Sequence, residues 1–192
     1  NKEASDDELV QMNKMAAAIV LTSQGIAFIH AGDEFARTKV NEDGSLNHNS
    51  YNSPDSVNKL DWKRKVEYKD LFNYYKGLIE LRKSHKAFRM NNTTDIQNNL
   101  EFLQKGKNFK EENVVAYTIA NSPNGEKAKN ILVAYNGNEE AVDITLPEGK
   151  WNVYINGEKA GTEVLETVEG TVSVAGISAV VLVQEGTNVA LI

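Results

Sequence analysis

A polar loop from residue 47 to residue 55, with the sequence NHNSYNSPD, carries side chains that could bind a ligand. Nearly all of them can donate or accept hydrogen bonds, and Tyr51 adds a flat aromatic ring. No helical or strand period runs through the segment. From these residues alone, the loop is either a binding element or a surface loop whose Asn and Ser side chains satisfy its own backbone.

A second group of reactive residue types follows the apolar run 26–30. His30 ends that run, and Asp33 and Glu34 form an adjacent acidic pair soon after it. Carboxylates and imidazole rings are common groups in general acid–base catalysis. Carboxylates in such a position also hold a nearby arginine, here Arg37, or accept hydrogen bonds from backbone amides, so both interpretations stay open.

Metal chemistry has little support in the sequence. Asn41, Glu42 and Asp43 before Gly44 hint at a calcium loop, but the regular ligand spacing and the distal Glu are missing. We therefore predict a plain turn there, no metal site and no cofactor. The absence of cysteine from the sequence excludes disulfides, thiolate zinc sites and cysteine nucleophiles.

The composition is that of an ordinary globular chain, with 41% hydrophobic and 25% charged residues among 192. A net charge of −6 argues against nucleic acid or an anionic membrane as a partner, because both favour a basic face. The sequence has no apolar run long enough to span a membrane. The lack of cysteine is compatible with the cytosol and with secretion by a bacterial type of organism that avoids cysteine, so the sequence assigns no compartment.

Two predicted helices frame these groups. Ser5 and Glu8 have the spacing of a capping box, and apolar residues follow at helical spacing until Gly25, a plausible terminator. The apolar run 26–30 lacks polar alternation, which is typical of a strand buried on both faces by helices. A second helix is predicted over residues 69–86, so the order of elements is that of an α/β unit.

From about residue 96 the pattern changes to short runs rich in Val, Ile, Tyr and Thr, separated by Asn-Gly and Glu-Gly turn signals. This spacing predicts a small antiparallel sandwich. The predicted strands are Val114–Ile119, Ile131–Tyr135, Val142–Leu146, Trp151–Ile155 and Ile177–Val183. We expect Trp62 and Trp151 in the core, and His48 and His85 in solvent.

One buried strand cannot form a sheet, because its backbone groups need neighbours on both sides. We therefore expect residues 1–92 to be the last part of a larger α/β domain, and residues 93–192 to be an all-β domain. Either the chain is a fragment of a longer protein, or a second chain supplies the missing strands.

The residues from Gln24 to Lys39, QGIAFIHAGDEFARTK, resemble the eighth strand and following loop of the barrel in the α-amylase clan. The ending EFARTK, the motif NSYNSPD, Asn58 and the tripeptide Leu60–Trp62 resemble the type I pullulanases in particular. Residues 96–192 resemble the C-terminal β-sandwich of that family in architecture. The resemblance implies the end of a (β/α)8 TIM barrel followed by an antiparallel β-sandwich.

The resemblance also implies an enzyme that hydrolyses α-1,6-glucosidic bonds in pullulan and branched α-glucans with retention of configuration. Retaining hydrolysis needs two carboxyl groups about 5 Å apart across the scissile bond. In the family, the catalytic carboxylates follow strands four, five and seven, the last in a His-Asp motif, and this chain has no His-Asp pair. The chain is therefore expected to hold no catalytic residue, to be inactive alone, and to need the remainder of the barrel, in the same polypeptide or as a separate chain.

The loop after strand eight lies at the catalytic face of such barrels, so the resemblance places the polar loop beside a sugar-binding cleft. Tyr51 would offer its ring to a glucose unit, while Asn52 and Asp55 would bind sugar hydroxyl groups. The partner would then be an α-glucan such as pullulan or a branched maltooligosaccharide.

His30, Glu34 and Arg37 would support this cleft from behind without touching the sugar, since the family places its catalytic carboxylates elsewhere. Two rival interpretations stay open. One is an isoamylase-type debranching enzyme or an α-amylase fragment, because linkage choice depends on cleft loops mostly outside this chain. The other is a non-catalytic α-glucan-binding subunit.

Overall fold

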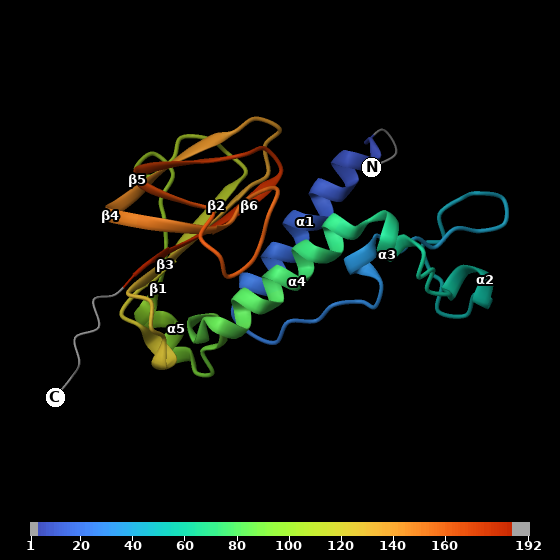
Figure 1. Ribbon diagram of the computed structural model, residues 1–192, viewed down its shortest axis with the longest axis horizontal. Helices are drawn as coiled ribbons and strands as arrows, with labels where there is room; N and C mark the ends of the chain where they lie inside the picture. The colour runs from blue at the N-terminus through green and yellow to red at the C-terminus, as the bar shows by residue number, and fades with distance from the viewer. Residues whose placement is uncertain (1–3, 186–192) are drawn as a thin grey trace.

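An antiparallel sheet and two long helices make up most of the protein (Figure 1). The computed structural model describes residues 4–185. The strands are β1 Leu100–Phe102, β2 Val114–Ile119, β3 Asn130–Asn136, β4 Val142–Ile155, β5 Glu166–Val174 and β6 Ser178–Gln184. The helices are α1 Asp6–Thr22, α2 Asp55–Asn58, α3 Arg64–Glu67, α4 Lys69–Ser84 and α5 Thr93–Asn99, with 3-10 turns at Asp33–Phe35, Lys86–Arg89 and Pro123–Gly125. None of the described helices is long and apolar enough to cross a membrane.

Helix α1 begins as the sequence predicts. The Ser5 hydroxyl accepts a hydrogen bond from the backbone N–H of Glu8 at 3.3 Å, and the Glu8 carboxylate accepts one from the Ser5 N–H at 2.7 Å. The predicted capping box is therefore confirmed. The helix ends at Thr22, and Gly25 soon follows with a φ of 95°, a conformation that most other residues avoid.

The six strands form one antiparallel sheet in the order β1-β2-β3-β6-β4-β5. Two predicted strands, Val142–Leu146 and Trp151–Ile155, are the two halves of the single strand β4. The Glu-Gly turn signal between them is a bulge, at which the pairing with β5 shifts register between Thr145 and Lys150. Strands β1 and β5 are absent from the sequence prediction because β1 is three residues long and β5 is largely polar and exposed.

Two hydrophobic cores lie on opposite faces of this sheet. On one face, side chains from both halves of β4 meet those of β2, β3 and β6 around Trp151, which is fully buried. On the other face, α1 and α4 share a core with β3 and β6. The core position of Trp151 is thus confirmed. The predicted antiparallel β-sandwich is, in the described residues, one six-stranded antiparallel sheet.

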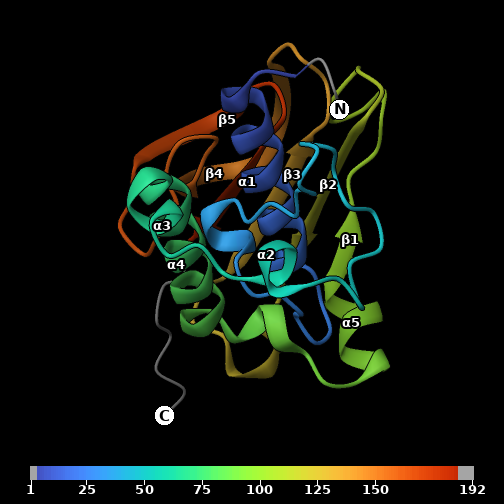
Figure 2. The same cartoon turned by 90° about the vertical axis from the view of Figure 1, so that its right-hand side faces the viewer.

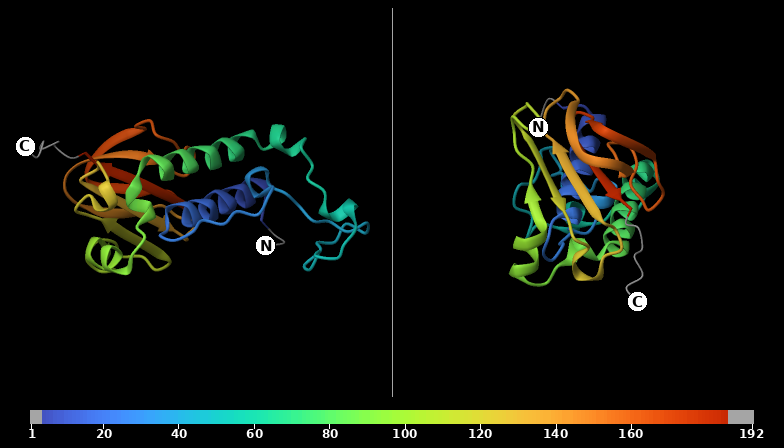
Figure 3. Two further views of the ribbon diagram at one scale, coloured as in Figure 1. Left: turned by 90° about the horizontal axis from the view of Figure 1, so that it is seen from below. Right: turned by 90° about the vertical axis from the view of Figure 1, so that its left-hand side faces the viewer.

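Helices α1 and α4 lie side by side and run in the same direction (Figure 3). The Tyr75 hydroxyl donates to the Asn13 side chain at 2.7 Å in the middle of the pair. About two turns further along both helices, the Arg82 guanidinium donates to the Leu21 carbonyl at 2.9 Å. A chain that joins two parallel neighbours must return along them, and the segment after α1 provides that return.

That return segment, residues 26–30, was expected to be a buried strand and forms no strand in the described structure. Its side chains alternate: Ala27 and Ile29 pack against the helical core, whereas Ile26 and Phe28 are 100% and 83% exposed. No strand lies beside it within residues 4–185 to complete a hydrogen-bonded ladder, so the described structure has no strand here and the predicted barrel strand stays a prediction.

The barrel end and the domain boundary near residue 92 stay predictions. The described residues form no parallel sheet, and the helices contact the β-sheet through a shared core rather than forming a separate body. Residues 1–3 and 186–192 of the two expected domains lie outside the described residues.

Candidate functional site

The polar loop projects from the molecule on the side where α1 and α4 begin, beyond α3 (Figures 1 and 2). Residues 31–46 separate it from the extended segment 26–30. It contains a turn from Ser50 to Ser53, closed by a hydrogen bond from the Ser53 N–H to the Ser50 carbonyl at 3.0 Å. Tyr51 and Asn52 are the two corner residues of this turn.

The three predicted sugar-contacting residues lie on this turn and on the short helix directly after it. The Tyr51 side chain is 88% exposed. Asn52 is also exposed, and the exposed Asp55 begins α2 immediately after Pro54. The structure therefore gathers one aromatic face and two polar groups on a short stretch that solvent reaches freely, the combination that a sugar needs for stacking and hydrogen bonding.

Arg37 lies behind the turn and is held by the protein backbone. Its Nη1 donates to the Ala31 carbonyl at 3.0 Å and lies 3.3 Å from His30 Nε2. Its Nη2 donates to the Asn58 carbonyl. The guanidinium therefore ties the end of the extended segment to the last residue of α2, which is an internal clamp rather than a free cation.

Glu34 accepts a hydrogen bond from the Gly32 N–H at 2.9 Å, so its carboxylate caps the turn that follows the extended segment. His30 Nδ1 lies 3.7 Å from the Asp33 carboxylate, and both side chains are about half exposed. The acidic pair is therefore engaged with the turn that directly follows the extended segment.

Glu34 also lines a groove of about 550 Å³ that lies between the extended segment and α4. Ile29 forms one wall, and Phe72, Tyr75 and Ile79 form the other. Burial raises the pKa of the Tyr75 hydroxyl, and the charges of the nearby acidic pair raise it further, so that this group stays neutral. The groove is mainly apolar, which suits contact with more protein better than contact with a sugar.

The segment Asn41–Gly44 forms a turn, with the Gly44 N–H donating to the Asn41 carbonyl at 3.0 Å. Asp43 accepts hydrogen bonds from the hydroxyl and the backbone N–H of Ser45, and these bonds lower the pKa of the Asp43 carboxyl. The carboxylate is engaged with its own turn. No cluster of three or more His, Cys, Asp or Glu side chains that could hold a metal occurs in the described part of the chain.

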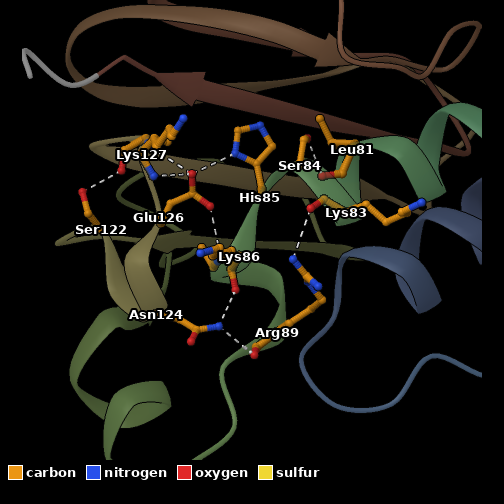
Figure 4. Close-up of polar contacts among 12 residues, drawn as sticks. Leu81, Lys83, Ser84, His85, Lys86, Arg89, Ser122, Asn124, Glu126 and Lys127 are labelled. Atoms are coloured by element: carbon orange, nitrogen blue, oxygen red, sulfur yellow. Dashed lines mark hydrogen bonds and ion pairs between the residues drawn. The ribbon is translucent and has the colours of Figure 1, made fainter.

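A second polar cluster joins the end of α4 to the β-domain (Figure 4). The buried carboxylate of Glu126 lies 3.2 Å from His85 Nδ1 and accepts hydrogen bonds from the backbone N–H groups of Ala87 and Ala128. Burial alone raises the pKa of Glu126, but the His85 ring and these two N–H groups outweigh it, and the pKa falls to about 2. The cluster is fully engaged internally, so it fastens two parts of the fold together.

Two expectations for single residues are wrong. His85, predicted in solvent, is largely buried, and its ring contacts the carboxylate of Glu126, 41 residues further along the chain. Trp62, predicted in a core, is 64% exposed. Its ring packs against the ring of Phe35, and the two centroids are 5.4 Å apart. Asn58 is a residue that the sequence argument leaves without a role, although it belongs to the motif that carries the resemblance.

Comparisons with known proteins agree with this architecture. A family model described as "Pullulanase, all-beta domain" matches residues 96–159. The pullulanase of Bacillus subtilis strain 168 is 34% identical over 180 residues, which is 94% of this chain and 24% of that protein. The solved pullulanase from Bacillus acidopullulyticus superimposes with a TM-score of 0.87 at 39% identity, over 96% of this chain and 22% of that one.

The chain belongs to the pullulanase family. A pullulanase type I from Bacillus subtilis strain 168, solved in complex with maltose, also superimposes, with a TM-score of 0.83 and 33% identity over 96% of this chain and 25% of that one. This chain therefore spans about a quarter of the length of the pullulanases that it matches. The matched family model and these relatives are all described as pullulanases.

Proposed function

We propose that this pullulanase segment closes a catalytic (β/α)8 barrel and carries the C-terminal β-domain of a retaining hydrolase specific for α-1,6-glucosidic bonds. The main support is the arrangement of α1, the extended segment and α4. Two parallel helices joined by an extended return segment are the repeating unit of an α/β barrel. Pullulanase relatives are about four times as long as this chain, so they contain further residues for such a barrel.

The open face of the extended segment supports the same proposal. Ala27 and Ile29 face the helices, as one side of a barrel strand does, and Ile26 and Phe28 face away from them. In a closed barrel the second side of each strand fills the barrel interior, where bulky apolar residues dominate. Two large exposed apolar side chains are thus accounted for by the rest of the barrel.

The polar loop follows the C-terminal end of this segment, which is the end at which barrel enzymes form their active sites. We propose that Tyr51 stacks on a glucose ring, that Asn52 and Asp55 bind its hydroxyl groups, and that His30 and Arg37 hold the loop in place. The bound α-glucan is pullulan or a branched maltooligosaccharide.

The catalytic carboxylates are proposed to lie outside this chain. Retaining hydrolysis requires a pair of carboxyl groups about 5 Å apart with the sugar between them. Asp33 and Glu34 are engaged with the turn around Gly32 and His30. The chain alone should therefore be inactive, and the remainder of the barrel, in the same polypeptide or as a separate chain, should restore activity.

The test is pullulan hydrolysis, measured as new reducing ends, with this chain alone, with the longer polypeptide that contains it, and with the two parts mixed. We expect no activity from the chain alone and activity whenever the remainder of the barrel is present. Activity from the pure chain would contradict the proposal and return attention to Asp33, Glu34 and Asp55. Cleavage of linear amylose in preference to pullulan would favour an α-1,4-acting enzyme instead.

A further inference from the structure

The turn that carries Tyr51 and Asn52 is held by one side chain from the following helix. The Asn58 Nδ2 donates to the Ser50 carbonyl at 2.7 Å and to the Ser53 carbonyl at 2.9 Å. These are the first and last residues of the turn. A single amide group therefore clamps both ends of the turn at once.

Few side chains could replace Asn58 in this contact. A primary amide has two N–H donors on one nitrogen, and Asn58 uses both for the two carbonyls. An aspartate of nearly the same shape has no donor when ionised and would point its charge at two carbonyl oxygens. An alanine would leave both carbonyls to water.

The clamp is itself anchored. The Asn58 carbonyl accepts a hydrogen bond from Arg37 Nη2, and Arg37 Nη1 donates to the Ala31 carbonyl at 3.0 Å. The position of the turn is thus linked, through two residues, to the end of the extended segment. The backbone at Ala31, 20 residues before Tyr51, is thus connected by hydrogen bonds to the turn that carries the Tyr51 ring.

Two further side chains hold the ends of the same turn. Lys39 Nζ donates to the Ser50 hydroxyl at 2.6 Å, and Asn47 Nδ2 donates to the Ser53 hydroxyl at 3.0 Å. Ser50 is buried, whereas Tyr51 next to it is almost fully exposed. The base of the turn is therefore fixed by several hydrogen bonds, while its corner stays free to meet a ligand.

We infer that Asn58 is a positioning residue for glucan binding: it holds the Ser50–Ser53 turn so that Tyr51 and Asn52 are preorganised for the sugar. This inference rests on the proposed function, since the turn must border the cleft. A binding loop that is ordered only part of the time loses affinity in proportion to the time it is disordered. Asn58 itself need not touch the sugar.

The experiment uses the longer pullulanase polypeptide that contains this chain, with Asn58→Ala and the nearly isosteric Asn58→Asp. Asn73→Ala is the matched control, because Asn73 is exposed on α4 and its side chain makes no hydrogen bond within residues 4–185. The readouts are hydrogen exchange of the Ser53 amide, which closes the turn, and KM and kcat on pullulan.

We expect both Asn58 variants to speed exchange at Ser53 and to raise KM about ten-fold, as the loss of two hydrogen bonds at a preorganised site suggests. We expect kcat to stay within about two-fold, because the catalytic groups are elsewhere. Exchange in β3, at the centre of the sheet, should not change, which shows that the fold is intact. Asn73→Ala should alter none of these quantities.

Unchanged exchange at Ser53, or faster exchange without a rise in KM, would overturn the inference. Tyr51→Ala, measured beside these variants, separates the two levels of the argument. If Tyr51→Ala raises KM and Asn58→Ala does not, the inference fails and the proposed cleft survives. If neither variant raises KM, the turn does not border the cleft, and the proposed function of the loop fails with the inference.

Discussion

The two long helices face two very different surroundings. On α4, Leu78 points to the β-sheet and is fully buried, whereas its neighbour Ile79 points to the groove and is 40% exposed. On α1, Leu21 is buried and the preceding Val20 is 39% exposed. Toward the sheet, the apolar residues of the helices have partners within the chain. Away from the sheet, in the described part of the chain, they meet the extended segment and the turn Asp33–Phe35 that follows it.

The polar contacts show the same contrast. On the sheet side the Tyr117 hydroxyl donates to the Thr22 carbonyl at 2.8 Å, and the Thr22 and Tyr135 hydroxyl groups lie 2.6 Å apart. On the other side, Ile26 and Phe28 expose large apolar side chains. The comparison teaches that these helices have two apolar faces, and that the described residues supply a partner for one of them.

The largest effect should come from a core residue on the closed side. Leu78→Ala should lower the free energy of unfolding of the chain by about 3 kcal/mol, because it leaves a cavity in the helix–sheet core. Ile79→Ala, the matched control one residue further along α4, should cost well under about 1 kcal/mol. Urea unfolding followed by circular dichroism measures both. Equal effects of the two variants would contradict the division into closed and open sides.

Gly77 tests the closest approach on the closed side. A Cβ atom at this position would lie 1.9 Å from the Ala160 carbonyl oxygen, in the loop after β4. Gly77→Ala should therefore destabilise the chain by about 2 kcal/mol, despite the better helix propensity of alanine. Gly161→Ala is the control, because its Cβ would meet nothing within 4 Å. A stabilised Gly77→Ala would show that α4 does not press on this loop.

The Glu126 cluster predicts how the closed side responds to acid. The pKa of Glu126 is lowered from 4.5 to about 2 in the folded protein. Its stabilising contribution is therefore complete above pH 4.5 and is lost as the pH falls toward 2. The full shift would correspond to about 3 kcal/mol, but solvent screens part of the interaction, so we expect a loss of about 1 to 2 kcal/mol from Glu126, beyond the loss caused by other groups.

Glu126→Gln should remove that part of the pH dependence, because glutamine does not titrate. The control is Glu163→Gln, since Glu163 is exposed in the loop between β4 and β5. Thermal unfolding at several pH values between 2 and 7 measures the difference. The assignment fails if Glu126→Gln follows the same pH curve as the unsubstituted chain.

The smallest effect in this chain should come from the open side. Phe28→Ser should change the free energy of unfolding of the chain by less than about 0.5 kcal/mol, because the ring is already exposed. In the longer pullulanase polypeptide the same change should cost more than about 2 kcal/mol if the ring lies in a barrel interior. A small effect in both proteins would count against the proposed barrel position of this segment.

Much of the local structure could be predicted because its signals are local. The capping box of Ser5 and Glu8, the apolar face of α4 and the runs that became β2, β3 and β6 all depend on residues within a few positions of one another. The errors occur where the partner is distant or outside the described residues. His85 could not be placed without Glu126, and segment 26–30 could not form a strand without a neighbouring strand.

The candidate site divides in the same way. The motif around Tyr51, Asn52 and Asp55 is continuous in sequence, so its residues could be named in advance. The hydrogen bonds from Asn58 to the turn and from Arg37 to Asn58 depend on how the chain folds back on itself. A motif shows which residues occur together, but it does not show which of them holds the others.

By itself, the sequence determined where the two long helices begin, which runs have strand character, and which polar groups occur together in the loop. These properties follow from backbone preference, side-chain periodicity and short-range hydrogen bonding, which act between near neighbours. Only the tertiary structure decided that two predicted strands are one bent β4, that Glu126 fastens α4 to the β-domain, and that Ile26 and Phe28 are left exposed. These outcomes depend on contacts between distant segments, since burial and ladder pairing need a partner that local sequence does not specify.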